Sequence, residues 1–410
     1  MSEKTERFIE SHWDECIKEN RNDTDTLIGM PYPYTVPAVG FFDCMYYWDT
    51  YFTNKGLECS GRYAQAKNNT DNMLYLVNRY GFMPNGSEKR YLNHSQPPFL
   101  SIMVKDVYEH YKDEVCLSGA YMCLEKEYNF WMTERMSPIG LNTYGGKVAG
   151  NDWTGWAQGF KNRVGFMPEG NLSDIGRHFH LTCESGWDIN PRWDFEAYNY
   201  APVDLNSLLY MLEDNMRYFS LILKNGRTEE WGRRAEKRRE LMYKYMDNGD
   251  GLFLDYNFKR DSLSKVFSAA SFYPMCAGLA ENEQAAAMVR NLGRLEAEYG
   301  ILSCEKNDDI KGNYQWGYPN GWACLQYMAF TALEKYGYIR EAVRIADKYV
   351  RLVDKVFEET GNLWEKYNVV EGNINVSNEY DMPKMMGWSA GVYLAAERFL
   401  KFNFKIREEV

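Results

Sequence analysis

Four acidic residues of the sequence lie in loop-like segments among aromatic residues and glycines: Asp49, Asp188, Glu365 and Glu379. Cleavage of a glycosidic bond commonly uses two carboxyl groups. One is protonated and releases the leaving oxygen, while the other is ionised and attacks the anomeric carbon or activates water. The chain contains 58 Asp and Glu residues, so a carboxylate alone is no signal. Neighbouring rings and glycines select these four, because burial beside them raises a carboxyl pKa as a general acid requires. Spacing alone does not decide whether each of the four acids is catalytic or forms structural hydrogen bonds.

The aromatic content of the chain is high, with 12 Trp, 32 Tyr and 21 Phe residues that make up 16% of the sequence. Aromatic residues usually fill cores. Here, however, many lie with Gly, Asn and Asp in clusters without helical or strand spacing, such as residues 46–49, 185–188 and 315–320. A flat ring can cover the apolar face of a sugar while polar side chains bind its hydroxyl groups. The clusters therefore predict a small carbohydrate substrate.

Composition and charge limit which partners, cofactors and cellular locations fit the chain. The formal net charge of -11 disfavours nucleic acid and anionic membranes as partners, and no apolar run approaches the ~18 residues of a membrane span. The five histidines lack metal-ligand spacing, so we expect no metal and no cofactor. Nine cysteines without a disulfide framework, together with a charged first segment that no apolar stretch follows, favour a cytoplasmic location.

The elements that must position these groups are predicted to be helices. Apolar residues recur at helical spacing in about a dozen segments: 6–19, 46–56, 64–79, 100–111, 117–133, 205–223, 229–245, 265–280, 283–299, 321–336, 339–357 and 387–402. No linker divides the chain, so we expect one catalytic domain over residues 1–410. The count favours an all-α (α/α)6 barrel with the site in the loops at one end. Residues 137–201 lack clear periodicity, and we interpret them as a long functional loop.

Five ordered blocks of the sequence resemble the trehalases of glycoside hydrolase family 37, with wider similarity to family 63. They cover nearly the whole chain: residues 40–52 (Gly-Phe-Phe-Asp-Cys-Met-Tyr-Tyr-Trp-Asp-Thr-Tyr-Phe); 81–86 with 95–99; 184–188 (Glu-Ser-Gly-Trp-Asp) with Arg192-Trp193 and 202–206; 315–316 with 319–323; and Glu365-Lys366-Tyr367, Glu379-Tyr380 and Gly387-Trp388.

The resemblance implies an (α/α)6 barrel and an inverting mechanism, with Asp188 as general acid and Glu365 as general base. Glu379 is the alternative base. Residues at the remaining motif positions are expected to hold the sugar: Trp48, Asp49, Asn72, Gln96, Trp187, Arg192, Trp316 and Glu379. Asn72 is included because it follows the first block at a family-like distance, and Trp187 and Trp316 because rings at these positions suit stacking. Arg192 has a second interpretation, in which it only holds a carboxylate in place.

The sequence departs from the trehalase pattern on the leaving-group side. Phe41, Asp43 and His94 stand where the family has arginines, and Gly317 replaces an acidic residue. Without these arginines, the strong bidentate hydrogen bonds that guanidinium groups donate to sugar hydroxyl groups are lost. We therefore predict an inverting α-glucosidase acting on a small α-glucoside whose leaving group differs from that of trehalose. Trehalose itself and a glucosyl- or mannosylglycerate-type substrate are the alternatives.

Two other function classes fit the chain less well. A sugar epimerase of the same fold typically uses a pair of histidines as bases, and no such pair stands out here. A non-catalytic sugar-binding protein would not need both Asp188 and Glu365.

Overall fold

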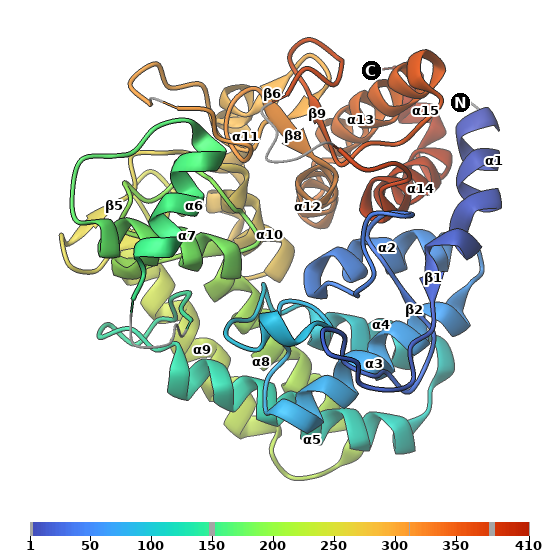
Figure 1. Ribbon diagram of the computed structural model, residues 1–410, viewed down its shortest axis with the longest axis horizontal. Helices are drawn as coiled ribbons and strands as arrows, with labels where there is room; N and C mark the ends of the chain where they lie inside the picture. Colours follow the sequence, from blue (N-terminus) through green and yellow to red (C-terminus); the bar gives the residue numbers. More distant parts are fainter. Residues whose placement is uncertain (1–2, 147–151, 311, 377–381, 410) are drawn as a thin grey trace.

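The computed structural model describes residues 3–146, 152–310, 312–376 and 382–409. Within these residues, twelve helices alternate along the chain between an outer and an inner ring (Figure 1). The inner ring comprises α2 (Tyr47–Cys59), α4 (Leu100–Tyr111), α8 (Val203–Leu223), α10 (Tyr273–Ala277), α12 (Ala323–Lys335) and α14 (Gly387–Phe402). The outer ring comprises α1 (Glu3–His12), α3 (Tyr63–Tyr80), α5 (Glu114–Glu134), α9 (Thr228–Met246), α11 (Asn282–Arg290) and α13 (Ile339–Thr360). This is the arrangement of an (α/α)6 barrel.

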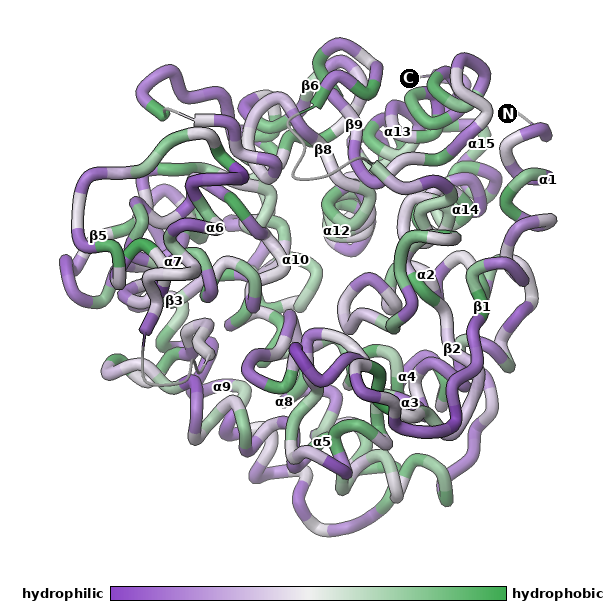
Figure 2. The backbone as a smooth tube through the Cα atoms, in the orientation of Figure 1, coloured by the Kyte–Doolittle hydropathy of each residue, from purple (hydrophilic) through white to green (hydrophobic). Residues whose placement is uncertain are grey.

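Contacts between inner helices run in the order α2, α14, α12, α10, α8 and α4. The outer helix α13 is amphipathic: hydrophobic and hydrophilic residues alternate along it (Figure 2), and its buried residues recur at helical spacing from Ala342 to Val356. The closest approach in the inner ring joins α2 to α14. A Cβ on Gly391 would lie 2.1 Å from the Phe52 carbonyl oxygen, and one on Gly56 would lie 2.5 Å from the Gly391 Cα. Glycine at both positions lets the two backbones touch.

The strands are short and antiparallel, and they lie in connections between helices. They are β1 (Ile17–Lys18) with β2 (Tyr34–Thr35); β3 (Tyr200–Ala201), β4 (Tyr256–Asn257) and β5 (Ser262–Leu263); β6 (Glu296–Ala297) with β7 (Gly300–Ile301); and β8 (Asn320–Trp322) with β9 (Lys366–Asn368). Short 3-10 helices cover Trp13–Cys16, Lys89–Tyr91, Ala197–Asn199, Ala269–Phe272 and Leu292–Arg294. A final helix, α15, spans Phe404–Arg407. No helix in the described ranges is long and apolar enough to cross a membrane.

The structure corrects the interpretation of residues 137–201 as one long loop. They contain α6 (Thr154–Val164) and α7 (Leu172–Glu184), which pack on each other outside the two rings (Figure 1). The hairpin has its own hydrophobic cluster around Phe160, Ile175 and Phe179. A Cβ on Gly176 would lie only 1.8 Å from the Trp153 carbonyl oxygen, so a glycine there permits the close packing.

Three predicted helices are shorter than their periodicity suggested. The helix predicted over 265–280 is reduced to a 3-10 turn and α10, because Ser268 pairs in extended conformation with Cys304 and the helix ends at Gly278, whose φ is +71°. The helix predicted over 283–299 ends at Arg290, and the β6–β7 hairpin follows. The helix predicted over 6–19 ends at His12, since β1 pairs with β2.

Candidate active site

A cavity of about 480 Å³ is lined by residues from several inner-ring connections and from the α6–α7 hairpin. Three of the four acids singled out in the sequence, Asp49, Asp188 and Glu365, line it together. Four tryptophans among its lining residues form one ring cluster: Trp48, Trp316, Trp322 and Trp388. The cavity therefore combines carboxyl groups and flat rings, as a sugar site requires.

Asp188 lies in a tight loop that follows α7. Gly186 has a φ of +72°, and a Cβ there would lie 2.6 Å from the Trp48 ring, so this turn requires glycine. The preceding Glu184 is buried and fixes the start of the loop. Its carboxylate accepts hydrogen bonds from Arg135 Nε and Nη2, both at 2.9 Å, and from the Ser95 backbone N–H at 2.7 Å.

The predicted sugar ligand Arg192 lies behind this loop, fully buried, and is not among the described residues that line the cavity. Its guanidinium group donates to Asp204 at 2.8 and 3.1 Å and to Asp255 at 2.8 and 2.9 Å. Trp187 is likewise buried behind the cavity wall, and its ring packs on that of Trp316 with centroids 5.1 Å apart. Both residues support the wall from behind.

Glu365 is held at the start of β9, whose register pairs Lys366 with Trp322. The Trp388 indole donates to the Glu365 backbone oxygen at 3.0 Å, and Lys366 Nζ donates to Glu365 Oε2 at 2.7 Å. Only 3% of Glu365 is exposed, and it lines the cavity. A buried carboxylate beside an ammonium group is suited to act as a base.

Asp49 lies in the first turn of α2 and faces the same cavity. Burial raises the pKa of Asp49 to about 7, and the nearby negative charge of Glu365 contributes to the increase. The neighbouring Trp48 is fixed through its backbone N–H, which donates to Gln96 Oε1 at 3.1 Å. Trp48, Asp49, Gln96 and Trp316, four of the residues expected to hold the sugar, thus all line the cavity.

Two further predicted ligands cannot be placed in the cavity. Asn72 is buried, and its amide exchanges hydrogen bonds with the Tyr32 backbone N–H and oxygen, both at 3.0 Å. It anchors the segment before β2 and is not among the described cavity residues. Glu379 lies outside the described residues.

Several cavity residues were not named as ligands from the sequence. Asn85, like Tyr46, Gln315, Trp322 and Trp388, belongs to a quoted block, so the motif signal could have found these cavity residues. Trp156 and Arg163 come from α6, inside the stretch without recognised periodicity. Others complete the wall: Arg90, Tyr91 and Met386.

Of the four departures from the trehalase pattern, Phe41 and His94 line the cavity. Burial lowers the pKa of His94 well below its usual range, and the neighbouring His180 and Arg135 lower it further, so its imidazole is neutral. Asp43 instead forms an ion pair with Lys18 at the surface. Gly317 lies beside Tyr314, outside the cavity's lining.

A family model described as trehalase matches residues 3–401. The chain belongs to the trehalase family. Periplasmic trehalase of Xanthomonas campestris pv. campestris is 30% identical over 412 residues, which cover 94% of this chain and 72% of that protein. Periplasmic trehalase of Pseudomonas aeruginosa is 32% identical over 394 residues, which cover 90% of this chain and 71% of that protein.

Solved structures agree with this family and confirm the (α/α)6 barrel. Neutral trehalase of Saccharomyces cerevisiae matches with a TM-score of 0.78 and 26% identity over 98% of this chain and 82% of that chain. A family 63 mannosylglycerate hydrolase of Thermus thermophilus, solved with glucose, shares the fold with a TM-score of 0.64 and 16% identity over 88% of this chain and 95% of that chain.

The trehalase-family chain is therefore a glycoside hydrolase, an inverting α-glucosidase that acts on a small carbohydrate. The epimerase and non-catalytic alternatives are wrong. The expected cytoplasmic location is contradicted, because the curated relatives above are named periplasmic trehalases. Free cysteines show only that a fold does without disulfides, and this does not decide the compartment.

Proposed function

We propose that residues 1–410 form one catalytic domain in which Asp188 and Glu365 hydrolyse an α-glucoside with inversion. The observation that carries the proposal is that these two acids, from connections far apart in sequence, line one tryptophan-walled cavity. Asp188 protonates the glycosidic oxygen as the bond to the anomeric carbon breaks. Glu365 takes a proton from the water that attacks this carbon from the opposite face.

The other cavity residues hold the glucose unit. Trp48 and Trp316 border the C–H surface of the sugar as part of the tryptophan wall, and Asp49 and Gln96 offer acceptors and a donor to its hydroxyl groups. Arg192 and Trp187 act as positioning residues, since each is buried behind the cavity wall, and Asn72 anchors the segment before β2.

The proposed substrate is α,α-trehalose, supported by the names of the curated relatives at about 30% identity over most of the chain. A second candidate is a small α-glucoside with another leaving group, including glucosyl- or mannosylglycerate. Phe41 and His94 favour it, because both line the cavity at positions where trehalases carry arginine.

Proton NMR of the first products tests the mechanism. Inversion of trehalose releases equal amounts of β- and α-glucose, because the attacked unit inverts and the leaving unit keeps its configuration. Early release of α-glucose alone would show retention and overturn the proposal.

A substrate panel decides between the two candidates. Trehalose turnover with kcat/KM of ~10⁴ M⁻¹s⁻¹ or more supports trehalose. A higher kcat/KM on glucosylglycerate, mannosylglycerate or another α-linked disaccharide than on trehalose would support the second candidate.

A further inference from the structure

Three side-chain contacts join the two loops that carry Asp188 and Glu365. Gln315 Nε2 donates to the Asp188 backbone oxygen at 3.4 Å, and Lys366 Nζ approaches Gln315 Oε1 at 3.4 Å. The same ammonium group donates to Glu365 Oε2 at 2.7 Å. A continuous path of polar contacts therefore runs from the backbone of one acid to the carboxylate of the other.

The centre of this path is rigidly built. The side chain of Lys366 is fully buried, and its Nζ lies 4.7 Å from the ring centroid of Trp322. The Gln315 backbone oxygen accepts from the Trp322 indole at 2.9 Å and from Asn320 Nδ2 at 3.0 Å. Because β8 and β9 pair Trp322 with Lys366, a shift of either strand would move both loops.

Two charged groups act on Glu365 from different elements among the described residues. The Lys366 ammonium group, on β9, pairs with the Glu365 carboxylate at 2.7 Å, whereas the Asp49 carboxyl group, on α2, is a second acid whose pKa the charge of Glu365 raises. A base that takes a proton from water must be ionised before the substrate binds. Lys366 supplies a positive charge beside this base.

We propose that Lys366 is a positioning residue of the reaction, which keeps Glu365 ionised and oriented and, through Gln315, sets its place relative to Asp188. The proposal rests on the proposed function, in which Glu365 is the base. Lys366 touches neither the substrate nor the attacking water in this scheme. It acts through the two groups that it holds.

The test compares Lys366→Met and Lys366→Arg for kcat, KM and the pH profile of kcat/KM on trehalose and on α-glucosyl fluoride. For Lys366→Met we expect kcat to fall about 10- to 100-fold on both substrates with a smaller change in KM, since misplaced catalytic groups cost this much. Measured in an Asp49→Asn background, where the ionisation of Asp49 is absent, the acidic limb of the profile should move to higher pH, because an opposite charge is lost beside the base. Lys366→Arg keeps the charge and should restore the limb.

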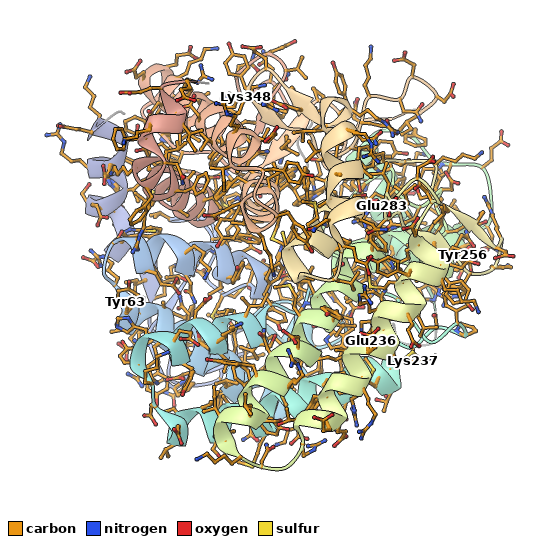
Figure 3. The ribbon with its side chains drawn as sticks, turned by 180° about the vertical axis from the view of Figure 1, so that it is seen from behind. Tyr63, Glu236, Lys237, Tyr256, Glu283 and Lys348 are labelled. Carbon is orange, nitrogen blue, oxygen red and sulfur yellow. The ribbon has the colours of Figure 1, made fainter. Side chains whose placement is uncertain are left out.

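A second variant, Gln315→Leu, leaves the Lys366–Glu365 ion pair in place and breaks the link to Asp188. We expect a lower kcat with an unmoved acidic limb. Lys348→Met is the matched control, because Lys348 pairs with Glu296 at 2.8 Å on the outer part of the molecule, away from the cavity (Figure 3).

The outcomes separate this inference from the proposed function. If Glu365→Gln abolishes turnover but a folded Lys366→Met keeps both its kcat and its acidic limb, the positioning role is wrong and the proposed function stands. If Glu365→Gln itself retains turnover, the proposed function fails first. Should Lys366→Met not fold, an unchanged kcat in a folded Gln315→Leu would overturn the proposal.

Discussion

The guanidinium carbon of Arg192 lies 4.5 Å from the ring centroid of Trp187 and 4.7 Å from that of Trp193. The cation is thus held between two indole rings while its N–H groups bind Asp204 and Asp255. Asp255 Oδ1 also accepts the Val203 backbone N–H at 2.9 Å, at the first residue of α8. One buried arginine therefore joins the loop of Asp188 to an inner helix.

Replacing this arginine should destabilise the protein strongly. For Arg192→Met we expect a loss of about 3–5 kcal/mol in the free energy of unfolding, because two buried carboxylates lose their partner. Urea unfolding measures the change. Arg217→Met is the control, since Arg217 forms an exposed ion pair with Asp214 and should cost ~1 kcal/mol or less. Equal effects of the two substitutions would contradict the role of Arg192.

Asp188→Asn and Glu365→Gln should each lower kcat on trehalose by about 10²- to 10⁴-fold, the usual contribution of a general acid or base. They should differ on α-glucosyl fluoride, whose leaving fluoride needs no proton. There Asp188→Asn should recover most of its activity, whereas Glu365→Gln should not. Glu359→Gln, at an exposed position near the end of α13, is the control for a remote acid. If only Glu365→Gln recovered on α-glucosyl fluoride, Glu365 would be the general acid and Asp188 the general base.

Asp49→Asn should lower kcat/KM by about 10- to 100-fold, mainly through KM, because hydrogen bonds that sugar hydroxyls donate to a charged carboxylate are lost. Burial and the charge of Glu365 raise the pKa of Asp49 to about 7, so this residue should ionise near neutral pH. The pH profile of kcat/KM reports groups of the free enzyme, so this ionisation should disappear in the variant. A profile that keeps it assigns the ionisation to another group.

Glu127 makes the stability of the protein depend on pH. It is buried on α5, where it accepts a hydrogen bond from the Tyr47 hydroxyl, and burial raises its pKa to about 7. Between the ordinary glutamate pKa near 4.5 and this value, the folded state binds more protons than the unfolded state, so stability falls as pH rises. The free energy of unfolding of Glu127→Gln minus that of the unchanged protein should therefore be larger at pH 8 than at pH 5, by about 2–4 kcal/mol.

Unfolding measurements at both pH values check this expectation. Glu236→Gln provides the control, because Glu236 is exposed on α9 (Figure 3) and its substitution should leave the pH dependence unchanged. A parallel shift of both variants would mean that Glu127 is not the group responsible.

Periodicity predicted the bounds of two inner-ring helices. The bounds predicted for residues 100–111 and 387–402 are those of α4 and α14. It failed where a distant strand or bridge decides the backbone, as at Ser268, which pairs with Cys304. It also missed α6 and α7, because the hydrophobic residues of this hairpin face its own small cluster.

The same limit applies to the site. The motifs identified Asp49, Asp188 and Glu365, which line one cavity, because local turns such as the one at Gly186 are determined by adjacent residues. The place of Arg192 depends on Asp255, which belongs to a connection after α9 and whose proximity no local pattern reveals.

The α6–α7 hairpin stands apart from both rings, yet it lends Trp156 and Arg163 to the cavity and leads directly into the loop of Asp188. Glu365, by contrast, comes from a connection between ring helices. Substitutions at Trp156 and Arg163 can therefore change the shape of the cavity without touching the β8–β9 pairing that holds Glu365.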